Sequence, residues 1–508
     1  MAVSCNLYPE TATSCNPDLE VADFSDMGGK GEVGEHREPG EIEATKTPMM
    51  DFTESPRYRR PSYHTGGIHS VESLEDMGMQ LEELEYYQPG GFHPVHIGDV
   101  LDGRYEVTHK LGSGGFATVW LCQDTISKCW KAVKIIIAQK SSERCPELEL
   151  KDTLGDSNLI ALPEQHFWID GPNGRHLALV LPILGPAACK TRDLVSDTDA
   201  IHKVCRQLAE ALHYIHSKGI CHGDFRPSNI LHRMYSIDSL TKEQIWEVVG
   251  WPFSSEHYFK VSTIAGGNPH PNAPRYAIRS ADLRRFQDWI INDEIAIIDF
   301  GVAFKVSNPC KNVGVPISHS APELLFEGHP TLCSDIWSLA CSILQLQGGD
   351  GFRNTTPCAV GDMEFFLGPL PEEYRQSYKR QFPPPDEKED DESGDETDYG
   401  EFDRDECWPM IPIDEKSAES YLVWKNRELQ EKRKMMQKSC GYSNLLNAEL
   451  GREKQLGGFG SLERQDYRMS RFEVLQLSDL LRKMFRYEPE QRLSAADVLN
   501  HPWLNPAK

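Results

Sequence analysis

The sequence lacks the cysteine spacing of a zinc site or a disulfide framework. Its 14 cysteines include no Cys-x-x-Cys pair and no regular interval. Scattered cysteines of this kind are typical of reduced thiols buried in the core of a protein in a reducing compartment. The first twenty residues, MAVSCNLYPETATSCNPDLE, also lack the basic start and apolar run of a secretory signal. Its apolar runs, such as residues 177–184, are too short to cross a bilayer. We therefore expect an intracellular, soluble protein.

Basic residues are scarce relative to acidic ones, and the imbalance is local. The chain has 508 residues, with 53 Lys and Arg against 78 Asp and Glu, a net charge of −25. Residues 1–90 contribute −12 and residues 386–406 contribute −11, so the remainder is nearly neutral. This distribution argues against a general nucleic-acid-binding surface. We expect the acidic run to be a solvated, mobile insertion, because its carboxylates repel one another and bury little apolar surface.

The amino-acid composition changes after the first 85 residues. Those residues are rich in Glu, Gly, Pro and Ser and are expected to be mostly disordered. At the end of this segment, residues 70–87 could form a helix that packs on the following domain. From residue 105 onward, alternating apolar segments around glycines predict three strands. Two stretches, about 235–290 and 383–406, interrupt the later pattern, and no internal repeat is present.

Apolar spacing in the second half predicts helices with identifiable ends. Apolar residues at 201, 204, 208, 212 and 215 suit one helix face, and Gly219 is placed to end that helix. Residues 334–346 predict a buried helix with Ser334 as its N-cap. Ser494 and Asp497 have the spacing of a capping box at the start of the last helix.

A glycine-rich stretch and a lysine predict a site for phosphate groups. The segment LGSGGFATV, residues 111–119, places Gly112 and Gly114 between strand-like segments, where the backbone can approach phosphates closely. Alone, this pattern fits an ordinary glycine hairpin equally well. Fifteen residues beyond it, Lys134 in AVK is placed to contact the α- and β-phosphates of a nucleotide. Glu147 would hold this lysine, with Glu149 as the alternative.

Three further polar residues predict phosphoryl transfer. In CHGDFRPSNIL, residues 221–231, Asp224 can accept the proton of an attacking hydroxyl, and Asn229 can reach a metal ion. The buried apolar strand IAIIDFG ends on Asp299, which is well placed to coordinate Mg²⁺. Each could be a satisfied loop residue by itself. Their common order along the chain, with Lys134 upstream, makes a coincidence improbable.

This order resembles both protein kinases and the aminoglycoside or choline phosphotransferases. The later motifs decide between them. APE at residues 321–323, SDIWSL at 334–339 and PEQRLSAADVLNHPWL near the end are similar to protein kinases, in the lobe that holds a polypeptide substrate. In that lobe we expect Glu323 to pair with Arg492. The resemblance implies an α+β, two-lobed protein kinase fold with a small β-rich N-lobe and a larger helical C-lobe.

Within the protein kinases, residues 86–124 resemble the start of SR-protein kinases, which phosphorylate serines in arginine/serine-rich splicing factors. HGDFRPSNIL and APELLF resemble the expanded SR-kinase-like branch of filamentous fungi. The resemblance covers about residues 80–505. It implies a kinase domain over 105–503, with the N-lobe at about 105–182, the C-lobe at about 186–503, a short spacer-like insert at 235–290 and the acidic insertion at 383–406. Asp224 and Asp299 lie 75 residues apart, which leaves room for that insert.

The resemblance also implies ATP and Mg²⁺ as cofactors and serine in a protein as the acceptor. Asp224, Lys134 and Arg226 would be catalytic, and Asn229 and Asp299 would bind the metal. It further implies a monomer of the cytoplasm and nucleus that binds Arg/Ser-rich proteins, with no direct contact to nucleic acid or membrane. The nucleotide would be bound by Leu111, Gly112, Ser113, Gly114, Gly115, Phe116, Ala117, Val119, Ala132, Lys134 and Glu147.

Several positions depart from the kinase pattern. Gly223 stands where many kinases have an arginine before the catalytic aspartate, so no positive charge there requires a phosphate on the activation segment. Ala117 replaces the third loop glycine, and Arg226 replaces the usual lysine. His319 and Ser320 replace an aromatic residue and an arginine before APE, which bears on substrate preference. The alternatives to an active protein kinase are a catalytically silent scaffold and a small-molecule phosphotransferase.

Overall fold

The computed structural model describes residues 69–71, 81–190, 198–263, 267–286, 291–310, 314–326, 328–347, 352–382, 452–455, 462–465 and 471–505. All of them belong to one compact unit, Thr53–Lys508. Most of the segment 1–85 and the whole acidic stretch 383–406 lie outside the described residues. In the described part of the chain no helix is both long and apolar enough to span a membrane. The ten cysteines described are free thiols.

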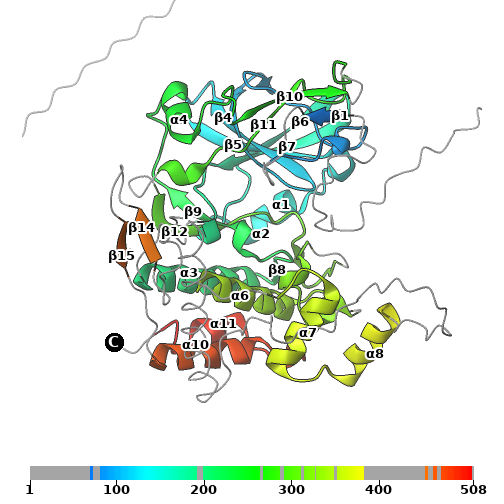
Figure 1. Ribbon diagram of the computed structural model, residues 1–508, viewed down its shortest axis with the longest axis vertical. Coiled ribbons are helices and arrows are strands. Elements are labelled where there is room, and N and C mark those ends of the chain that lie inside the picture. The colour runs from blue at the N-terminus through cyan, green and yellow to red at the C-terminus, as the bar shows by residue number, and fades with distance from the viewer. Residues whose placement is uncertain are drawn as a thin grey trace, which may run out of the picture. The chain divides into compact units, whose positions relative to one another are not determined.

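A six-stranded antiparallel sheet forms the β-rich N-lobe (Figure 1), with three strands more than the sequence analysis predicted. Alternate side chains of its strands, including those of Val107, Val133 and Val180, meet in one apolar cluster. Beta-branched residues favour such a pleated, half-buried surface. In sheet order the strands are β2 (Val100–Leu101), β3 (Tyr105–Ser113), β4 (Ala117–Asp124), β5 (Trp130–Ile136), β7 (Gly174–Pro182) and β6 (Gln165–Gly171).

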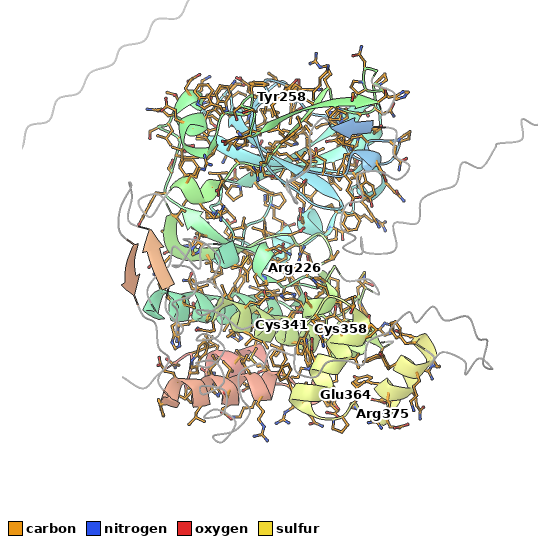
Figure 2. All side chains as sticks on the ribbon, viewed as in Figure 1. Arg226, Tyr258, Cys341, Cys358, Glu364 and Arg375 are labelled. Carbon is orange, nitrogen blue, oxygen red and sulfur yellow. The ribbon has the colours of Figure 1, made fainter. Side chains whose placement is uncertain are left out.

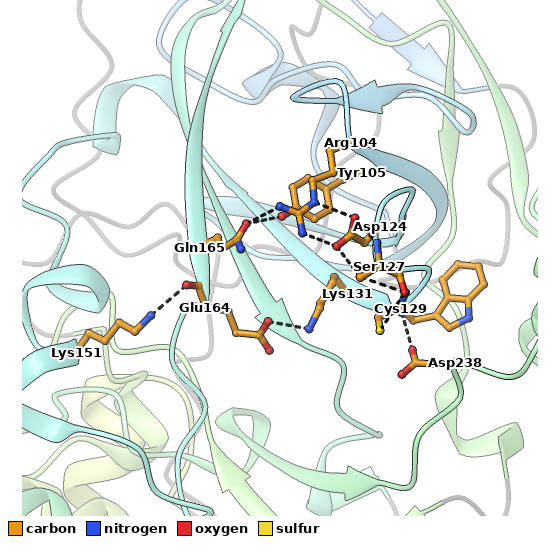
Figure 3. A network of polar contacts seen from close by, with 11 residues as sticks. Arg104, Tyr105, Asp124, Ser127, Cys129, Lys131, Lys151, Glu164, Gln165 and Asp238 are labelled. Atoms are coloured by element: carbon orange, nitrogen blue, oxygen red, sulfur yellow. Dashed lines mark hydrogen bonds and ion pairs between the residues drawn. The ribbon is translucent and has the colours of Figure 1, made fainter. Parts of the chain in front are cut away.

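Polar side chains tie this sheet together laterally (Figure 3). The guanidinium of Arg104 donates to both carboxylate oxygens of Asp124, at 2.8 and 2.6 Å, and to Gln165 Oε1 at 3.0 Å. Hydrogen bonds from Arg104 lower the pKa of the Asp124 carboxyl. Lys131 on β5 donates to Glu164 just before β6 at 2.7 Å. These contacts join strands that are distant in the sequence.

The C-lobe is built around two helices, α3 (Thr198–Ser217) and α6 (Leu332–Leu346). Nearly every residue of α6 is buried, including Cys341, which Figure 2 marks inside the helical lobe. Further helices pack into the same core. They are α5 (Pro322–Leu325), α7 (Thr356–Leu367), α8 (Glu372–Gln381), α10 (Arg471–Met484) and α11 (Ala495–Leu499). A hairpin of β14 (Arg452–Gln455) and β15 (Leu462–Gln465) lies between α8 and α10 in the sequence.

Two of the three predicted helix ends are confirmed. Gly219, with φ of 68°, follows the end of α3, and the capping box of Ser494 and Asp497 starts α11. The prediction that Ser334 caps α6 is wrong. The helix begins earlier because Thr331 is the N-cap, and Ser334 is its N3 partner in a capping box. A serine at N3 can accept a hydrogen bond from the N-cap backbone N–H, as Ser334 Oγ does from Thr331 N at 3.1 Å, so the two positions look alike in the sequence.

The interruption between Asp224 and Asp299 folds onto the N-lobe. It contains α4 (Lys242–Val249), β10 (Tyr258–Thr263), β11 (Tyr276–Ile278) and the 3-10 turn η5 (Leu283–Phe286). The indole of Trp246 donates to Thr108 O at 3.1 Å, and Trp130 N donates to Asp238 Oδ1 at 2.7 Å. Buried side chains of α4 share a cluster with Trp130. Tyr258 lies at the far side of the N-lobe from the helices (Figure 2).

The expected helix over residues 70–87 is not formed in the described part of that segment. There, β1 (His69–Val71) pairs with β10, and a 3-10 turn, η1, spans Leu84–Tyr86. The exposed edge of β10 offers hydrogen-bond partners to an extended segment, which favours a strand over a helix. The segment does pack on the domain, because Leu84 and Tyr87 are buried.

Candidate active site

The glycine-rich loop joins β3 to β4. Gly112 pairs with Val119 across the two strands, and Gly114 N donates to Ala117 O at 2.9 Å to close the turn. A Cβ atom added at Gly112 or Gly114 would have no atom within 4 Å. The space beside this backbone is therefore open, as a loop that approaches phosphates requires. The remaining predicted loop residues are Leu111, Ser113, Gly115, Phe116 and Ala117, and Ala132 lies on the adjacent strand β5.

Lys134 connects the two lobes. It pairs with Val119 across β4 and β5, and its Nζ donates to Glu147 Oε1 and to Asp299 Oδ1, both at 2.7 Å. Burial would lower the pKa of Lys134, but the carboxylates of Asp299 and Glu147 outweigh it and raise that pKa. Glu147 is on the short helix α1 (Pro146–Glu149) and is buried, whereas Glu149 is exposed. The geometry therefore selects Glu147 over Glu149.

The loop after β8 (Ile220–Cys221) carries Asp224, Arg226 and Asn229. Asn229 Nδ2 donates to Asp224 O and to Asp224 Oδ2, both at 2.9 Å. Arg226 Nε lies 2.9 Å from Asp224 Oδ1, and Figure 2 shows Arg226 between the sheet and the helices. Burial raises the pKa of the Asp224 carboxyl to about 7. This carboxylate is thus held by two neighbours and poised to exchange a proton near neutral pH.

Asp335 supports this loop from inside helix α6, a role that sequence analysis missed. Its carboxylate accepts His222 N at 2.7 Å and Gly223 N at 3.0 Å, and lies 3.0 Å from His216 Nε2. Asp335 is only 1% exposed. Since buried carboxylates need such partners, an aspartate as the one charged residue of this helix was the available signal.

Asp299 follows β12 (Ile291–Ile297). This strand pairs with β9 (Ile230–Met234), which begins directly after Asn229. Its φ of 66° is unusual for a residue other than glycine. Lys134 lowers the pKa of the Asp299 carboxyl to about 2, so it is ionised. The strained backbone angle of Asp299 is typical of functional positions, where the surrounding fold holds the backbone in place.

These donors fit a magnesium–nucleotide complex. Asp299 supplies a carboxylate, and Asn229 supplies a carbonyl oxygen because its amide nitrogen is already engaged by Asp224. Oxygen ligands of this kind suit Mg²⁺, which keeps several waters and binds through one or two protein groups and phosphates. Glu147 Oε2 is buried with no hydrogen-bond partner in the described residues. Mg²⁺ would neutralise charge that develops on the phosphates.

The segment before APE is close to the loop that carries Asp224. Gly314 N donates to Gly223 O at 3.3 Å, and a Cβ at Gly314 would lie 3.4 Å from the Asp224 side chain. Ser320 Oγ donates to Val315 O at 3.2 Å, and Ser318 Oγ lies 2.9 Å from Nδ1 of buried His319. Both serines are buried, so neither hydroxyl is presented to another enzyme in this conformation.

The predicted ion pair between Glu323 and Arg492 is present. Arg492 donates to the two oxygens of Glu323 at 2.7 and 2.6 Å, and Ser334 Oγ donates to Glu323 Oε1 at 3.0 Å. Both charged side chains are buried. A bidentate pair of this kind fixes geometry as well as charge. It anchors the APE segment to the end of the helical lobe.

A β-sheet lobe that supplies a lysine–glutamate pair, joined to a helical lobe that supplies Asp224, Asn229 and Asp299, defines the protein kinase class. The protein kinase domain family matches residues 105–239 and 287–504. The chain belongs to this family, which uses ATP and a divalent metal ion in general. The gap in the match, residues 240–286, corresponds to most of the insert.

Its curated relatives are SR-protein kinases. The serine/threonine-protein kinase spk-1 of Caenorhabditis briggsae is 36% identical over 38% of this chain and 19% of that protein. SRSF protein kinase 3 of Homo sapiens is 35% identical over 30% of this chain and 29% of that protein. The SRPK of Physarum polycephalum is 24% identical over 83% of this chain and 91% of that protein. The matches span about a fifth of the length of spk-1. The resemblance to SR-protein kinases seen in the sequence is thereby confirmed, whereas the branch of filamentous fungi stays a prediction.

Proposed function

We propose that this protein is an active serine/threonine kinase that transfers the γ-phosphoryl group of ATP to serine in arginine/serine-rich proteins. The observation that carries the proposal is the double contact of Lys134 Nζ, which reaches Glu147 and Asp299 at 2.7 Å each. This contact joins Lys134, the proposed phosphate-binding residue, to Asp299, the proposed metal-binding residue, across the two lobes. Catalysis of phosphoryl transfer depends mostly on such positioning and on electrostatic stabilisation.

Each residue has a role in the proposed reaction. The acceptor serine would lose its proton to Asp224, whose position is fixed by Asn229 and Arg226. Arg226 would also place a cation near the transferred group. Lys134 would bind the α- and β-phosphates, and the open backbone of Gly112 and Gly114 would cover them.

Two other functions are less well supported. A silent scaffold has no need of Lys134, Asp224, Asn229 and Asp299 together in bonded positions. A small-molecule phosphotransferase has no need of the buried pair between Glu323 and Arg492 that anchors the polypeptide-holding lobe. Both alternatives are outcomes of one assay, in which a silent scaffold would turn over ATP with none of the acceptors.

That assay measures ATP turnover with an Arg/Ser-repeat peptide, a matched Lys/Ser peptide, choline and an aminoglycoside. We expect turnover on the Arg/Ser peptide to exceed that on the Lys/Ser peptide, because the arginine guanidinium can bond to carboxylates through two parallel bonds. Equal rates on the two peptides would contradict the substrate class, and turnover only on choline or the aminoglycoside would contradict the protein kinase proposal. Several relatives are named SRSF protein kinase, which motivates the peptide choice. We further propose the cytoplasm and nucleus as its location, which imaging of the tagged protein would test.

A further inference from the structure

The tip of the glycine-rich loop packs on segments that lie outside the matched kinase domain. Phe116 is partly buried against an apolar cluster drawn from the segment before the domain, from the insert and from the end of the N-lobe sheet. Its backbone oxygen accepts Ile137 N at 2.9 Å. Members of the cluster include Leu84, Tyr87, Phe92, Ile137, Phe259 and Val261.

The base of the same loop is also held from outside. Lys110, directly before Leu111, has a fully buried side chain that forms an ion pair with Glu82 of the preceding segment. Tyr87 Oη donates to the other oxygen of Glu82 at 2.6 Å. From the insert, Ala281 N donates to Lys110 O at 2.8 Å. A buried ion pair with a second bonded partner holds a side chain in one position.

Asn173 joins the two outside segments to each other. It is 2% exposed and lies in the turn between β6 and β7. Its Nδ2 donates to Phe92 O at 2.6 Å and to Asn272 O at 2.8 Å, and its Oδ1 accepts Asn272 Nδ2 at 2.8 Å. Its backbone oxygen accepts Gly90 N at 2.7 Å. All its side-chain groups are therefore committed to the segment before the domain and to the insert.

We propose that Phe259, Asn173 and Glu82 are positioning residues that hold the glycine-rich loop in place over the nucleotide phosphates. The inference rests on the proposed kinase function. A glycine-rich loop has high conformational freedom, and ordering it when the nucleotide binds costs free energy. Packing Phe116 and fixing Lys110 in the free protein reduces that cost, so the nucleotide binds more tightly.

The test compares Phe259→Ala with Phe253→Ala in the full chain. Phe259 is 6% exposed and belongs to the cluster, whereas Phe253 is 55% exposed on the same insert and lies beside Tyr258 and Tyr276 instead. Fluorescence titration with N-methylanthraniloyl-ADP gives the nucleotide Kd without turnover. We expect Phe259→Ala to raise this Kd and the KM for ATP by about 3- to 10-fold. This is the size expected if nucleotide binding must also order the glycine-rich loop. The KM for peptide should not change, and Phe253→Ala should match wild type.

A purely structural role predicts a different pattern. It would lower the melting temperature of Phe259→Ala and leave the nucleotide Kd at the wild-type value, which would overturn the proposal. If Phe259→Ala does not fold, Asn173→Ser and Phe259→Leu provide the same comparison, with unchanged Kd again overturning it. Wild-type protein that binds the ADP probe but phosphorylates no peptide would contradict the proposed function alone. Failure of wild type to bind the probe would overturn both.

Discussion

Lys134 on strand β5 forms an ion pair with Asp299, which lies 165 residues later in the chain, at 2.7 Å. Three residues earlier on the same strand, Lys131 forms an ion pair of equal length with Glu164. The two pairs differ in place. The first joins the N-lobe to the C-lobe at the predicted site residues. The second lies within the N-lobe and joins β5 to the residue before β6.

We predict that Lys134→Met and Asp299→Ala each abolish measurable phosphoryl transfer while the protein stays folded. In the proposed reaction both residues would act on the phosphates or the metal, where catalysis is mostly electrostatic. Lys131→Met is the matched control and should keep wild-type turnover. ATP turnover and a circular dichroism melt check this prediction. Wild-type turnover in Asp299→Ala would exclude the proposed kinase activity.

Substitution of Asp335 should slow catalysis without a direct contact to substrate. Asp335→Asn keeps the shape of the side chain but brings an NH₂ group toward the N–H groups of His222 and Gly223. We expect kcat to fall on the order of 10- to 100-fold, as for other small displacements of catalytic groups, with the KM for ATP nearly constant. Asp362→Asn, which breaks another C-lobe pair with Arg353, is the control for general destabilisation. If the two variants lose kcat equally, Asp335 has no specific role.

We predict that activity does not require phosphorylation of the activation segment. Gly223 carries no side chain that a phosphate would have to balance. Of the three hydroxyls in the segment, those of Ser318 and Ser320 are buried and already in polar contacts, whereas Ser307 is exposed and would meet no arginine at position 223. Phosphatase-treated protein, shown by mass spectrometry to be unmodified over residues 299–323, should turn over ATP at the untreated rate. Loss of activity that returns on rephosphorylation would show that a switch exists.

Acid should destabilise the fold between about pH 6.5 and 4, because two buried histidines gain protons more readily in the unfolded chain. Burial lowers the pKa of His93 and of His109 to about 4, from 6.5 in the unfolded chain. Between these values the unfolded chain binds more protons, so stability is complete above about pH 6.5 and is lost as the pH falls toward 4. Each histidine would account for up to about 3 kcal/mol. In urea unfolding, His109→Gln should lose less unfolding free energy than wild type as the pH falls. His329 is exposed, so His329→Gln should lose as much as wild type. A flat stability between pH 6.5 and 4.5 would contradict the assignment.

The sequence predicted the sheet, the main helices and the kinase fold because these features depend on nearby residues. Periodic apolar positions define α3, and the lysine, aspartates and asparagine occur in short segments with fixed spacing. The choice between Glu147 and Glu149 needed the fold, because both lie on one short helix and only one points to Lys134. Residues 70–87 were misread because the partner of β1 is β10, nearly two hundred residues away.

Contacts between distant segments were likewise not predictable. Asp335 binds a loop 112 residues earlier, and Asn173 binds Asn272, 99 residues later. Asp335 was marked in the sequence only as the one charged residue of α6, which does not reveal its partners, and no local pattern distinguishes Asn173 from a surface residue. The burial that commits both side chains to these partners is known only once the chain has folded.

The insert and the segment before the domain affect where this protein can be cut for expression. Trimming the chain to the family match, 105–239 and 287–504, would remove Ile245, Val249 and Phe286 from a buried cluster and expose Leu121 and Trp130. It would also leave the Lys110 ammonium buried without its carboxylate. Fragments designed on that match are expected to aggregate, since they expose a contiguous apolar surface. A fragment that begins at residue 69 and keeps residues 235–290 retains these contacts, and is the smaller form that crystallographers should make first.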